Sequence, residues 1–445
     1  MKNILVLGAG RSSSSLIKYL LDNARTGEWN LTVGDVSLEA ARKKIGASEV
    51  GKAMQFNIND PEQSKAIMAA SDIVISLLPP PLHPTVALYC LSAGRHLITA
   101  SYVSDEMKTF DEVARSKGLI FLNECGLDPG IDHLSAMKVI DGIKKNGGAI
   151  TSFESFTGGL IAPETDPGNP WRYKFTWNPR NVVMAGQGTA RYRQDGKSKF
   201  ISYALLFRRL TQIHVPGYGQ FEGYANRDSL KYIDTYDLQG IETMLRGTLR
   251  HKGFCAAWNI LAQLGCCDDT YPMEGVSQLT HAGFMDSFLP PYPEGGSIEA
   301  KIGALFGLNP AGDEMKMLRW SGFFEETPVG LTEGTPAMIL EWILNKKWAL
   351  KAEDKDQIVM WHRFRYLLEG NKKEIQASLV ANGDDAVYTA MSKTVGLPLG
   401  IATKLIASDK IRARGVVIPT TPEFYKPILR ELETFGITLQ EVEVP

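Results

Sequence analysis

The chain has 445 residues and a formal net charge of -2 at pH 7, with 44% hydrophobic and 22% charged residues. This composition is typical of a globular protein with two or three domains and a large core. The balanced charge provides no basic face for a phosphate backbone, which argues against nucleic acid as the main partner.

Cysteine, histidine and hydropathy patterns exclude further classes. The five cysteines are odd in number and form no C-x-x-C pair, so we expect neither a disulfide framework nor a zinc site, and a cytoplasmic location. The seven histidines show no metal-ligand spacing. The most apolar stretch, residues 72–91, contains four prolines, whereas a membrane span needs about 20 largely uninterrupted apolar residues. We therefore predict no metal and no membrane segment.

The first 125 residues alternate short apolar runs with helix-length polar segments. Near-continuous Val, Ile and Leu runs separated by helices indicate buried parallel strands in βαβ units. We expect a Rossmann-like, doubly wound parallel α/β sheet, forming an NAD-binding domain over residues 1–125. The predicted strands are residues 3–8, 31–35, 54–58, 72–78, 96–100 and 119–123.

The first predicted strand ends in a glycine-containing turn. Gly8 suits the tight turn, and Gly10 allows a pyrophosphate to approach the backbone at the start of the next helix. The third glycine position holds Ser13, so this is a degenerate form of a weak fingerprint. Its place after a terminal buried strand still favours a dinucleotide site made by Gly8, Gly10, Arg11, Ser12 and Ser13.

Asp35 ends the second predicted strand, where a dinucleotide fold holds the adenosine ribose. A carboxylate there accepts hydrogen bonds from both ribose hydroxyls and repels a 2′-phosphate, so we predict NAD in preference to NADP. The alternative is that Asp35 only caps a helix or turn. The basic run Arg42, Lys43 and Lys44 could weaken the preference, so NADP stays possible.

The ends of the later strands provide further positions for the dinucleotide, because ligands of open α/β sheets bind outside the carboxyl ends of the strands. In chain order, we expect these positions to contact adenine, the pyrophosphate side and the nicotinamide. The alternative for the leucines among them is a place in the core. In that order the positions are Asn57 and Ile58, then Leu77 and Leu78, then Ala100, Ser101 and Tyr102.

A polar segment, residues 123–133, follows the sixth predicted strand. Its Asp-Pro-Gly sequence is common in turns. Because it follows the carboxyl end of a strand, Asp128 is also a candidate catalytic residue. His133 follows on an opening helix, where capping or a core contact is the commoner role and a catalytic base the alternative. We expect Cys125 to be a buried structural thiol.

After residue 126 the pattern changes to alternating strands and long aromatic loops. This predicts an inserted α+β domain for substrate binding and dimerisation over residues 126–385. A hairpin is expected from residues 357–366 and 374–381, then a helix from residue 386 to 406 and a strand-turn-helix unit over residues 415–435.

Five segments occur in an order that resembles the saccharopine dehydrogenase family of the glutamate-forming type, over nearly the whole chain. The resemblance implies that residues 386–445 return to the Rossmann domain, with a separate C-terminal domain as the alternative, and that the protein is a homodimer. The segments are TASY (99–102), LDPGIDH (127–133), GGLIAPETDPGNPWRYKFTW (158–177), EGYANRDSLKY (222–232) and RGTLRHKGF (246–254).

The resemblance also implies a reaction: reversible, NAD-dependent oxidation of the secondary amine saccharopine, followed by hydrolysis to L-glutamate and 2-aminoadipate 6-semialdehyde. Arginine forks suit the three carboxylates of this substrate. Asp128 would hold the amine and stabilise an iminium charge, while Tyr102 or water takes the proton. The positions that match the family's substrate contacts are Ser101, Tyr102, Asp128, Arg227, Thr248, Leu249 and Arg250.

Two other functions stay open from the sequence. A carboxynorspermidine-type dehydrogenase also acts on a secondary amine, but its cationic polyamine substrate calls for an acidic cleft rather than an arginine pair. A non-catalytic NAD(H)-binding redox sensor would use the same fold. The sequence does not decide whether the enzyme works in lysine breakdown or synthesis.

Overall fold

A computed structural model describes residues 1–291 and 296–444. The chain forms two compact units: the first contains residues 1–148 and 379–440, and the second contains residues 149–378 and the chain end from residue 441. Of the predicted domain ranges, residues 292–295 and 445 lie outside the described part.

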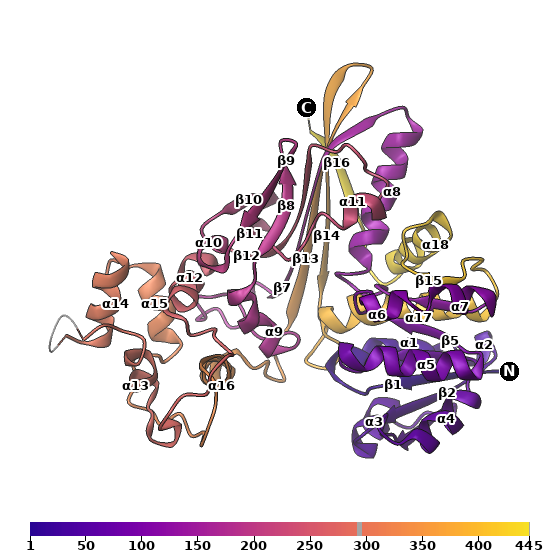
Figure 1. Ribbon diagram of the computed structural model, residues 1–445, viewed down its shortest axis with the longest axis horizontal. Coiled ribbons are helices and arrows are strands. Elements are labelled where there is room, and N and C mark those ends of the chain that lie inside the picture. Colours follow the sequence, from indigo (N-terminus) through magenta and orange to yellow (C-terminus); the bar gives the residue numbers. More distant parts are fainter. Residues whose placement is uncertain (292–295, 445) are drawn as a thin grey trace. The chain divides into compact units, whose positions relative to one another are not determined.

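A seven-stranded, fully parallel sheet forms the centre of the first unit, in the order β15-β6-β5-β4-β1-β2-β3 (Figure 1). The strand order reverses between β1 and β4, which is the switch point where such sheets bind ligands. The predicted Rossmann-like fold is therefore confirmed. Its strands are β1 (Lys2–Leu7), β2 (Trp29–Asp35), β3 (Gly51–Gln55), β4 (Ile73–Ser76), β5 (His96–Thr99), β6 (Ile120–Leu122) and β15 (Gly415–Val417).

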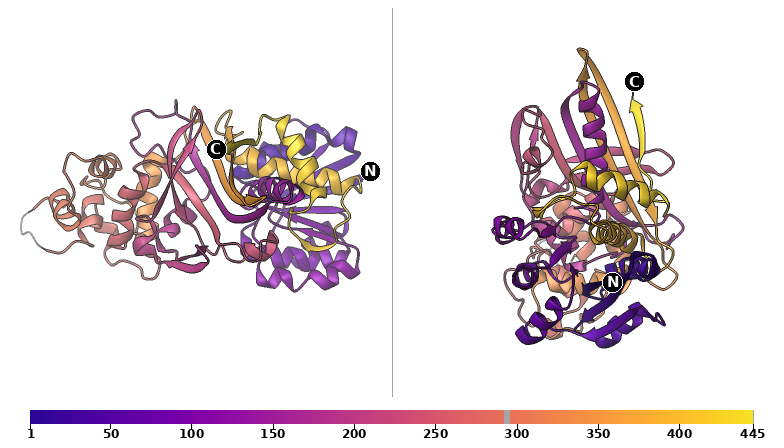
Figure 2. Two further views of the ribbon diagram at one scale, coloured as in Figure 1. Left: turned by 90° about the horizontal axis from the view of Figure 1, so that it is seen from above. Right: turned by 90° about the vertical axis from the view of Figure 1, so that its right-hand side faces the viewer.

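Helices cover both faces of this sheet, which is why its strands read as continuous apolar runs (Figure 2). Leu5 and Leu7 pack toward the face with α4 and α5, while α1 and α17 lie together on the other face. The helices of this unit are η1 (Arg11–Ser13), α1 (Ser14–Asp22), α2 (Ala24–Gly27), α3 (Leu38–Ile45), α4 (Pro61–Ala69), η2 (Pro80–Leu82), α5 (His83–Ala93), α6 (Asp105–Lys108), α7 (Asp111–Ser116), α8 (Ile131–Lys145), α17 (Ala390–Ala407) and α18 (Pro422–Glu433).

The C-terminal segment contributes β15, α17 and α18 to the first unit. Helix α17 approaches α1 closely because it presents glycine at the contact: a Cβ on Gly396 would lie 2.6 Å from the Leu16 backbone nitrogen, and one on Gly400 2.4 Å from the Tyr19 ring. Helix α8 packs against α18 in the same unit. As a compact unit, the first part of the chain therefore extends to residue 148, after α8, beyond the predicted domain end at residue 125.

A nine-stranded mixed sheet forms the centre of the second unit, in the order β10-β11-β12-β7-β13-β14-β16, with β8 paired to β12 and β9 to β8. Strands β13 and β14 form the predicted hairpin. The strands are β7 (Ala149–Ile161), β8 (Ala190–Gln194), β9 (Lys197–Ile201), β10 (Leu210–Val215), β11 (Gly219–Ala225), β12 (Thr243–His251), β13 (Asp356–Leu368), β14 (Asn371–Asn382) and β16 (Gln440–Val444).

An aromatic cluster fills the core beside this sheet. Trp171, Tyr173, Trp258 and Trp348 are almost fully buried and make edge or stacked contacts. The helices of this unit are α9 (Pro179–Met184), η3 (Ala185–Gln187), α10 (Tyr203–Leu206), α11 (Tyr232–Thr235), α12 (Phe254–Leu264), η4 (Val276–Gln278), α13 (His281–Asp286), α14 (Ile298–Phe306), α15 (Asp313–Trp320) and α16 (Pro336–Trp348).

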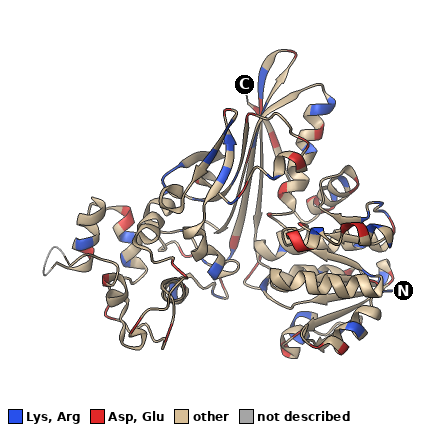
Figure 3. Cartoon of the chain, in the orientation of Figure 1, with Lys and Arg blue, Asp and Glu red and all other residues tan. Residues whose placement is uncertain are grey.

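Charged residues of both signs are interspersed over the two units (Figure 3). Within the described residues, none of the helices combines the length and the apolar character that a membrane crossing requires. The same residues contain no group of three or more His, Cys, Asp or Glu side chains arranged to hold a metal ion.

Candidate active site

The glycine turn after β1 lies at the switch point of the first sheet. Gly8 has φ +104°, a conformation that favours glycine, and a Cβ there would lie 3.1 Å from the Leu77 carbonyl oxygen. Gly10 precedes η1, and a Cβ there would meet no atom within 4 Å. Ser13 is buried, and its hydroxyl donates to the Gly10 carbonyl at 2.8 Å. The open backbone at Gly10 fits the approach of a phosphate group.

Asp35 connects the end of β2 to this turn. Its Oδ2 accepts the Ala9 backbone N–H at 2.7 Å, and its Oδ1 accepts the Ser37 backbone N–H at 2.9 Å. Ser37 in turn caps α3 by accepting the Ala40 N–H. Asp35 therefore has the structural role that we weighed as an alternative; its contact with ribose stays a prediction.

The positions predicted beside adenine and pyrophosphate differ in how exposed their side chains are. Asn57 is exposed, whereas Ile58 lies in the hydrophobic core and Leu78 packs against that core. Leu77 donates its backbone N–H to the Leu7 carbonyl at 2.8 Å. Of these positions, Asn57 has the side chain best placed for a polar ligand contact.

A buried histidine missed in the sequence lies behind the predicted nicotinamide segment. His83 contacts the Ser76 hydroxyl through Nδ1 at 2.9 Å and the Ser101 hydroxyl through Nε2 at 2.8 Å, with Thr99 Oγ1 at 3.3 Å. Desolvation lowers the pKa of His83 to about 4, so the ring is neutral at pH 7. His83 therefore couples Ser101 to strands β4 and β5. The Pro-rich sequence around it gave no sign of this role.

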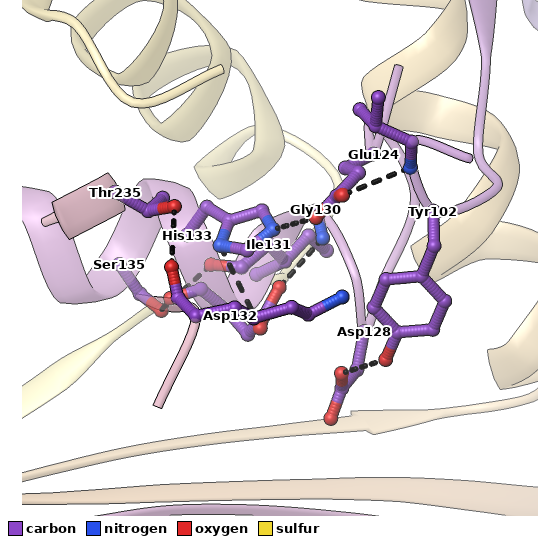
Figure 4. A network of polar contacts seen from close by, with 11 residues as sticks. Tyr102, Glu124, Asp128, Gly130, Ile131, Asp132, His133, Ser135 and Thr235 are labelled. Atoms are coloured by element: carbon purple, nitrogen blue, oxygen red, sulfur yellow. Dashed lines mark hydrogen bonds and ion pairs between the residues drawn. The ribbon is translucent and has the colours of Figure 1, made fainter. Parts of the chain in front are cut away.

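Tyr102 and Asp128, the two predicted catalytic residues, point toward one another (Figure 4). The Tyr102 hydroxyl donates to Asp128 Oδ1 at 3.2 Å, and both side chains are partly exposed. Tyr102 follows β5, and Asp128 lies in the turn after β6. The turn needs glycine, because Gly130 has φ +148° and a Cβ there would overlap the Gly126 backbone.

His133 is fully buried and contacts Glu124, not a solvent-facing group. Its Nε2 donates to Glu124 Oε2 at 2.8 Å, and Asp132 Oδ1 accepts the Gly130 backbone N–H at 2.6 Å. This geometry favours the core-contact role expected for His133. Cys125 is also buried, and desolvation raises the pKa of its thiol, as a structural cysteine requires.

Arg250, on β12 of the second unit, is a buried guanidinium. It lies 4.9 Å from the Tyr173 ring centroid and 5.2 Å from that of Phe254. One hydrogen bond is made, from Nη1 to the Leu249 carbonyl at 3.0 Å. Among the described residues, its Nε has no hydrogen-bond partner and no carboxylate lies within 4.0 Å.

Glu222 lies opposite Arg250 in the register of β11 and β12 but binds other groups. Glu222 accepts the backbone N–H groups of Gly253 and Cys255 at 2.8 and 3.3 Å, at the start of α12. The Tyr173 hydroxyl is also buried without a hydrogen-bond partner among the described residues. A buried cation beside an unpaired hydroxyl is suited to an anionic ligand.

The remaining predicted substrate contacts lie on or next to the neighbouring strands. Arg227 is exposed, with φ +50°, in the loop after β11. Its neighbour Asp228 pairs with Arg191. Thr248 is partly exposed on β12, whereas the Leu249 side chain is fully buried and can offer a ligand only its backbone.

The glycine turn, the switch point and the acid-hydroxyl pair beside it define a nucleotide-dependent oxidoreductase of the doubly wound α/β class. Residues 4–122 match the family described as "Saccharopine dehydrogenase NADP binding domain", and residues 126–437 match "Saccharopine dehydrogenase C-terminal domain". The chain belongs to the saccharopine dehydrogenase family, as its sequence motifs indicated.

Individual relatives agree with this assignment. "Saccharopine dehydrogenase [NADP(+), L-glutamate-forming]" of Schizosaccharomyces pombe is 33% identical over 450 residues, which is 99% of each chain. The mitochondrial alpha-aminoadipic semialdehyde synthase of Bos taurus is 34% identical over 98% of this chain, which spans only 47% of that relative. The apo saccharopine dehydrogenase (L-Glu forming) of Saccharomyces cerevisiae has the same fold, with a TM-score of 0.90 at 30% identity and full coverage of both chains.

Proposed function

We propose that this chain catalyses the reversible oxidation of saccharopine by NAD in lysine metabolism. Saccharopine, NAD⁺ and water give L-glutamate, 2-aminoadipate 6-semialdehyde, NADH and a proton. The observation that carries the proposal is the Tyr102–Asp128 pair beyond the carboxyl ends of β5 and β6, at the edge of the parallel sheet where such folds bind ligands. The names of full-length relatives support the same substrate.

Asp128 and Tyr102 act on the reacting amine. A nicotinamide cofactor, when bound, would supply the hydride acceptor for the carbon that came from the lysine ε-position. The Asp128 carboxylate holds the substrate ammonium and then stabilises the positive charge of the C=N bond that forms. In this scheme Tyr102, which donates to one carboxylate oxygen of Asp128, exchanges a proton with the amine or with water. Water then adds to the C=N bond, which releases glutamate and the aldehyde.

Arg250 binds a substrate carboxylate in this scheme. A carboxylate supplies the charge and the acceptor oxygens that its buried guanidinium lacks, and Tyr173 can donate to the same anion. Arg227, which is exposed, provides a second fork for a substrate with three carboxylates. A polyamine substrate would leave the Arg250 charge unpaired, so this feature disfavours the carboxynorspermidine reaction.

NAD is the preferred cofactor in this proposal. Asp35 places a carboxylate at the end of β2, where it repels a 2′-phosphate. The basic residues Arg42, Lys43 and Lys44 lie in the last turn of α3 and do not directly follow the strand. Three fungal relatives are named for NADP⁺, so the test below compares both cofactors.

The test is reduction of NAD⁺ and of NADP⁺ by the purified protein, followed at 340 nm with saccharopine or carboxynorspermidine. We expect saccharopine-dependent NADH formation, with L-glutamate and the semialdehyde as products. Turnover of the polyamine alone would assign the chain to the rival enzyme. Binding of NADH without turnover of either amine would support the redox-sensor function instead.

The homodimer is proposed on the resemblance alone, and the cytoplasmic location on the sparse, odd-numbered cysteines. Light scattering on the purified protein tests the dimer, since a mass near 49 kDa would show a monomer. Fractionation of the source cells tests the location.

A further inference from the structure

We propose that Glu124 is a positioning residue for Tyr102, and that His133 fixes the Glu124 carboxylate. The inference rests on the proposed function and adds to it a buried group that does not touch the substrate. It concerns only the first unit, where Glu124 follows β6 and Tyr102 follows β5.

Glu124 holds the chain on both sides of Tyr102. Its backbone N–H donates to the Ser101 carbonyl at 3.1 Å, and its Oε1 accepts the Val103 backbone N–H at 3.0 Å. Figure 4 shows this second contact reaching the segment that carries the tyrosine ring. The two peptide groups that flank Tyr102 are therefore both bound to one residue, which fixes the backbone from which its ring projects.

The other carboxylate oxygen of Glu124 is bound to helix α8. His133 Nε2 donates to it at 2.8 Å from inside the first turn of that helix. One residue earlier, Asp132 accepts the Gly130 N–H, which belongs to the turn that carries Asp128. The start of α8 is thus linked through Glu124 to Tyr102 and through Asp132 to the Asp128 turn.

The backbone of Glu124 indicates that its side chain matters. Its φ is +55°, a left-handed conformation that glycine or asparagine adopts at lower cost. The residue is 4% exposed, so its charge is also out of water. A buried glutamate at a left-handed position is unfavourable by itself, and the bonds to Val103 and His133 offset this cost.

The geometry of the catalytic pair depends on such support. The Tyr102–Asp128 contact is 3.2 Å, longer than is usual for a hydroxyl-carboxylate hydrogen bond. A loop free to shift would break this contact and misplace the hydroxyl relative to the reacting amine. Small errors of this kind reduce catalytic rate more than binding.

Two substitutions separate side-chain length from charge. Glu124→Gln keeps an oxygen for the Val103 N–H, and its amide N–H can donate to His133 Nε2 when the imidazole carries its proton on Nδ1, which faces Asp132, so the support is retained. Glu124→Asp keeps the charge on a stem one methylene shorter, which cannot reach both partners. We expect kcat for saccharopine to fall about tenfold in Glu124→Asp but within about threefold in Glu124→Gln, with KM nearly unchanged in both. The deuterium isotope effect on kcat should rise in Glu124→Asp.

A stability control completes the experiment. Glu431→Gln weakens a partly buried cluster with Lys404 and Tyr19 in the same unit, and should lower the melting temperature with kcat unchanged. A Glu124→Asp variant that loses stability yet keeps wild-type kcat and isotope effect would overturn the inference. So would Glu124→Gln losing more activity than Glu124→Asp, because charge and not reach would then be what matters. Lack of saccharopine turnover in the wild-type protein would instead refute the proposed function.

Discussion

The polar groups of the two units differ in how they are satisfied. At the edge of the first sheet, His83, Glu124 and Asp132 bind partners within the same unit. In the second unit, the described residues offer the Arg250 guanidinium no acid within salt-bridge distance and leave its Nε without a partner. These groups of the first unit are paired within that unit, whereas the second unit holds a buried guanidinium with no acid beside it among the described residues.

This difference indicates two kinds of functional group. The first unit has preorganised its hydroxyls and carboxylates, so that little rearrangement is needed when charge develops during the reaction. The second unit accepts the desolvation cost of an unpaired cation, which binding of a substrate carboxylate would repay. Substitution of Arg250 should therefore lower activity without a loss of stability.

Arg250→Met is expected to give the largest effect. Methionine keeps the length of the side chain against Tyr173 and Phe254 but removes the charge. Loss of a buried charge-assisted contact should lower kcat/KM for saccharopine about 1,000-fold, or about 4 kcal/mol. The melting temperature should hold or rise, because no described acid loses its partner. Steady-state kinetics and calorimetry measure the two quantities.

The matched control is Arg180→Met, in the same unit. Arg180 is partly exposed and pairs with Asp269 and Glu341, so its loss should leave saccharopine kinetics unchanged. If Arg250→Met instead unfolded the protein while the folded fraction stayed active, Arg250 would be a structural residue and the contrast between the units would fail.

Asp128→Asn should have the next largest effect. The amide oxygen can still accept the Tyr102 hydroxyl, so the turn and the loop keep their places. Loss of the negative charge beside the developing C=N⁺ should lower kcat about 100-fold. Stability should change little, as measured by the melting temperature. A kcat within twofold of wild type would remove Asp128 from the chemistry.

The sequence predicted correctly that residues after two strands lie together, but it gave the wrong bounds for the third strand. Tyr102 and Asp128 were expected at one sheet edge because parallel strands deliver their carboxyl ends together, and they do lie in contact. The third strand was expected at residues 54–58 but is Gly51–Gln55. As a partly exposed edge strand it needs few apolar residues, whereas Phe56 and Ile58 are buried in the loop that follows it.

The supporting residues could not be read from the sequence. His83 and Glu124 act through partners far along the chain, namely Ser101 and His133, and no local spacing reports such contacts. The unpaired state of Arg250 is likewise a tertiary property, since Glu222 stands opposite it in the strand register but caps α12 instead. Periodicity predicts which face is buried, not which polar groups meet there.

Asp35→Ser tests the cofactor part of the first unit. Serine can still accept one of the two backbone N–H groups that Asp35 binds, so the glycine turn should persist. Removal of the carboxylate should shift the ratio of kcat/KM for NAD⁺ over NADP⁺ about tenfold toward NADP⁺. Both cofactors are compared at saturating saccharopine. An unchanged ratio would leave Asp35 with only its structural role.

The smallest expected effect is a loss of stability at low pH, caused by one buried histidine in each unit. Desolvation is the main cause that lowers the pKa to about 4 for His83 in the first unit and for His251 in the second. The unfolded chain takes up protons near pH 6.5 and the folded chain only near pH 4, so stability is complete above pH 6.5 and falls as the pH drops toward 4. Each histidine should lower the free energy of unfolding by about 1 kcal/mol at pH 5.5.

Optical probes can assign this loss to a unit. Seven of the eight tryptophans belong to the second unit, with Trp29 the exception, so fluorescence follows mainly that unit while circular dichroism follows both. His251→Gln should flatten the pH dependence of unfolding seen by fluorescence, and His83→Gln should flatten only the part seen by circular dichroism. If His83→Gln left the pH dependence of unfolding seen by circular dichroism unchanged, burial would not lower the pKa of His83. The contrast between the two units would then lose its support from His83.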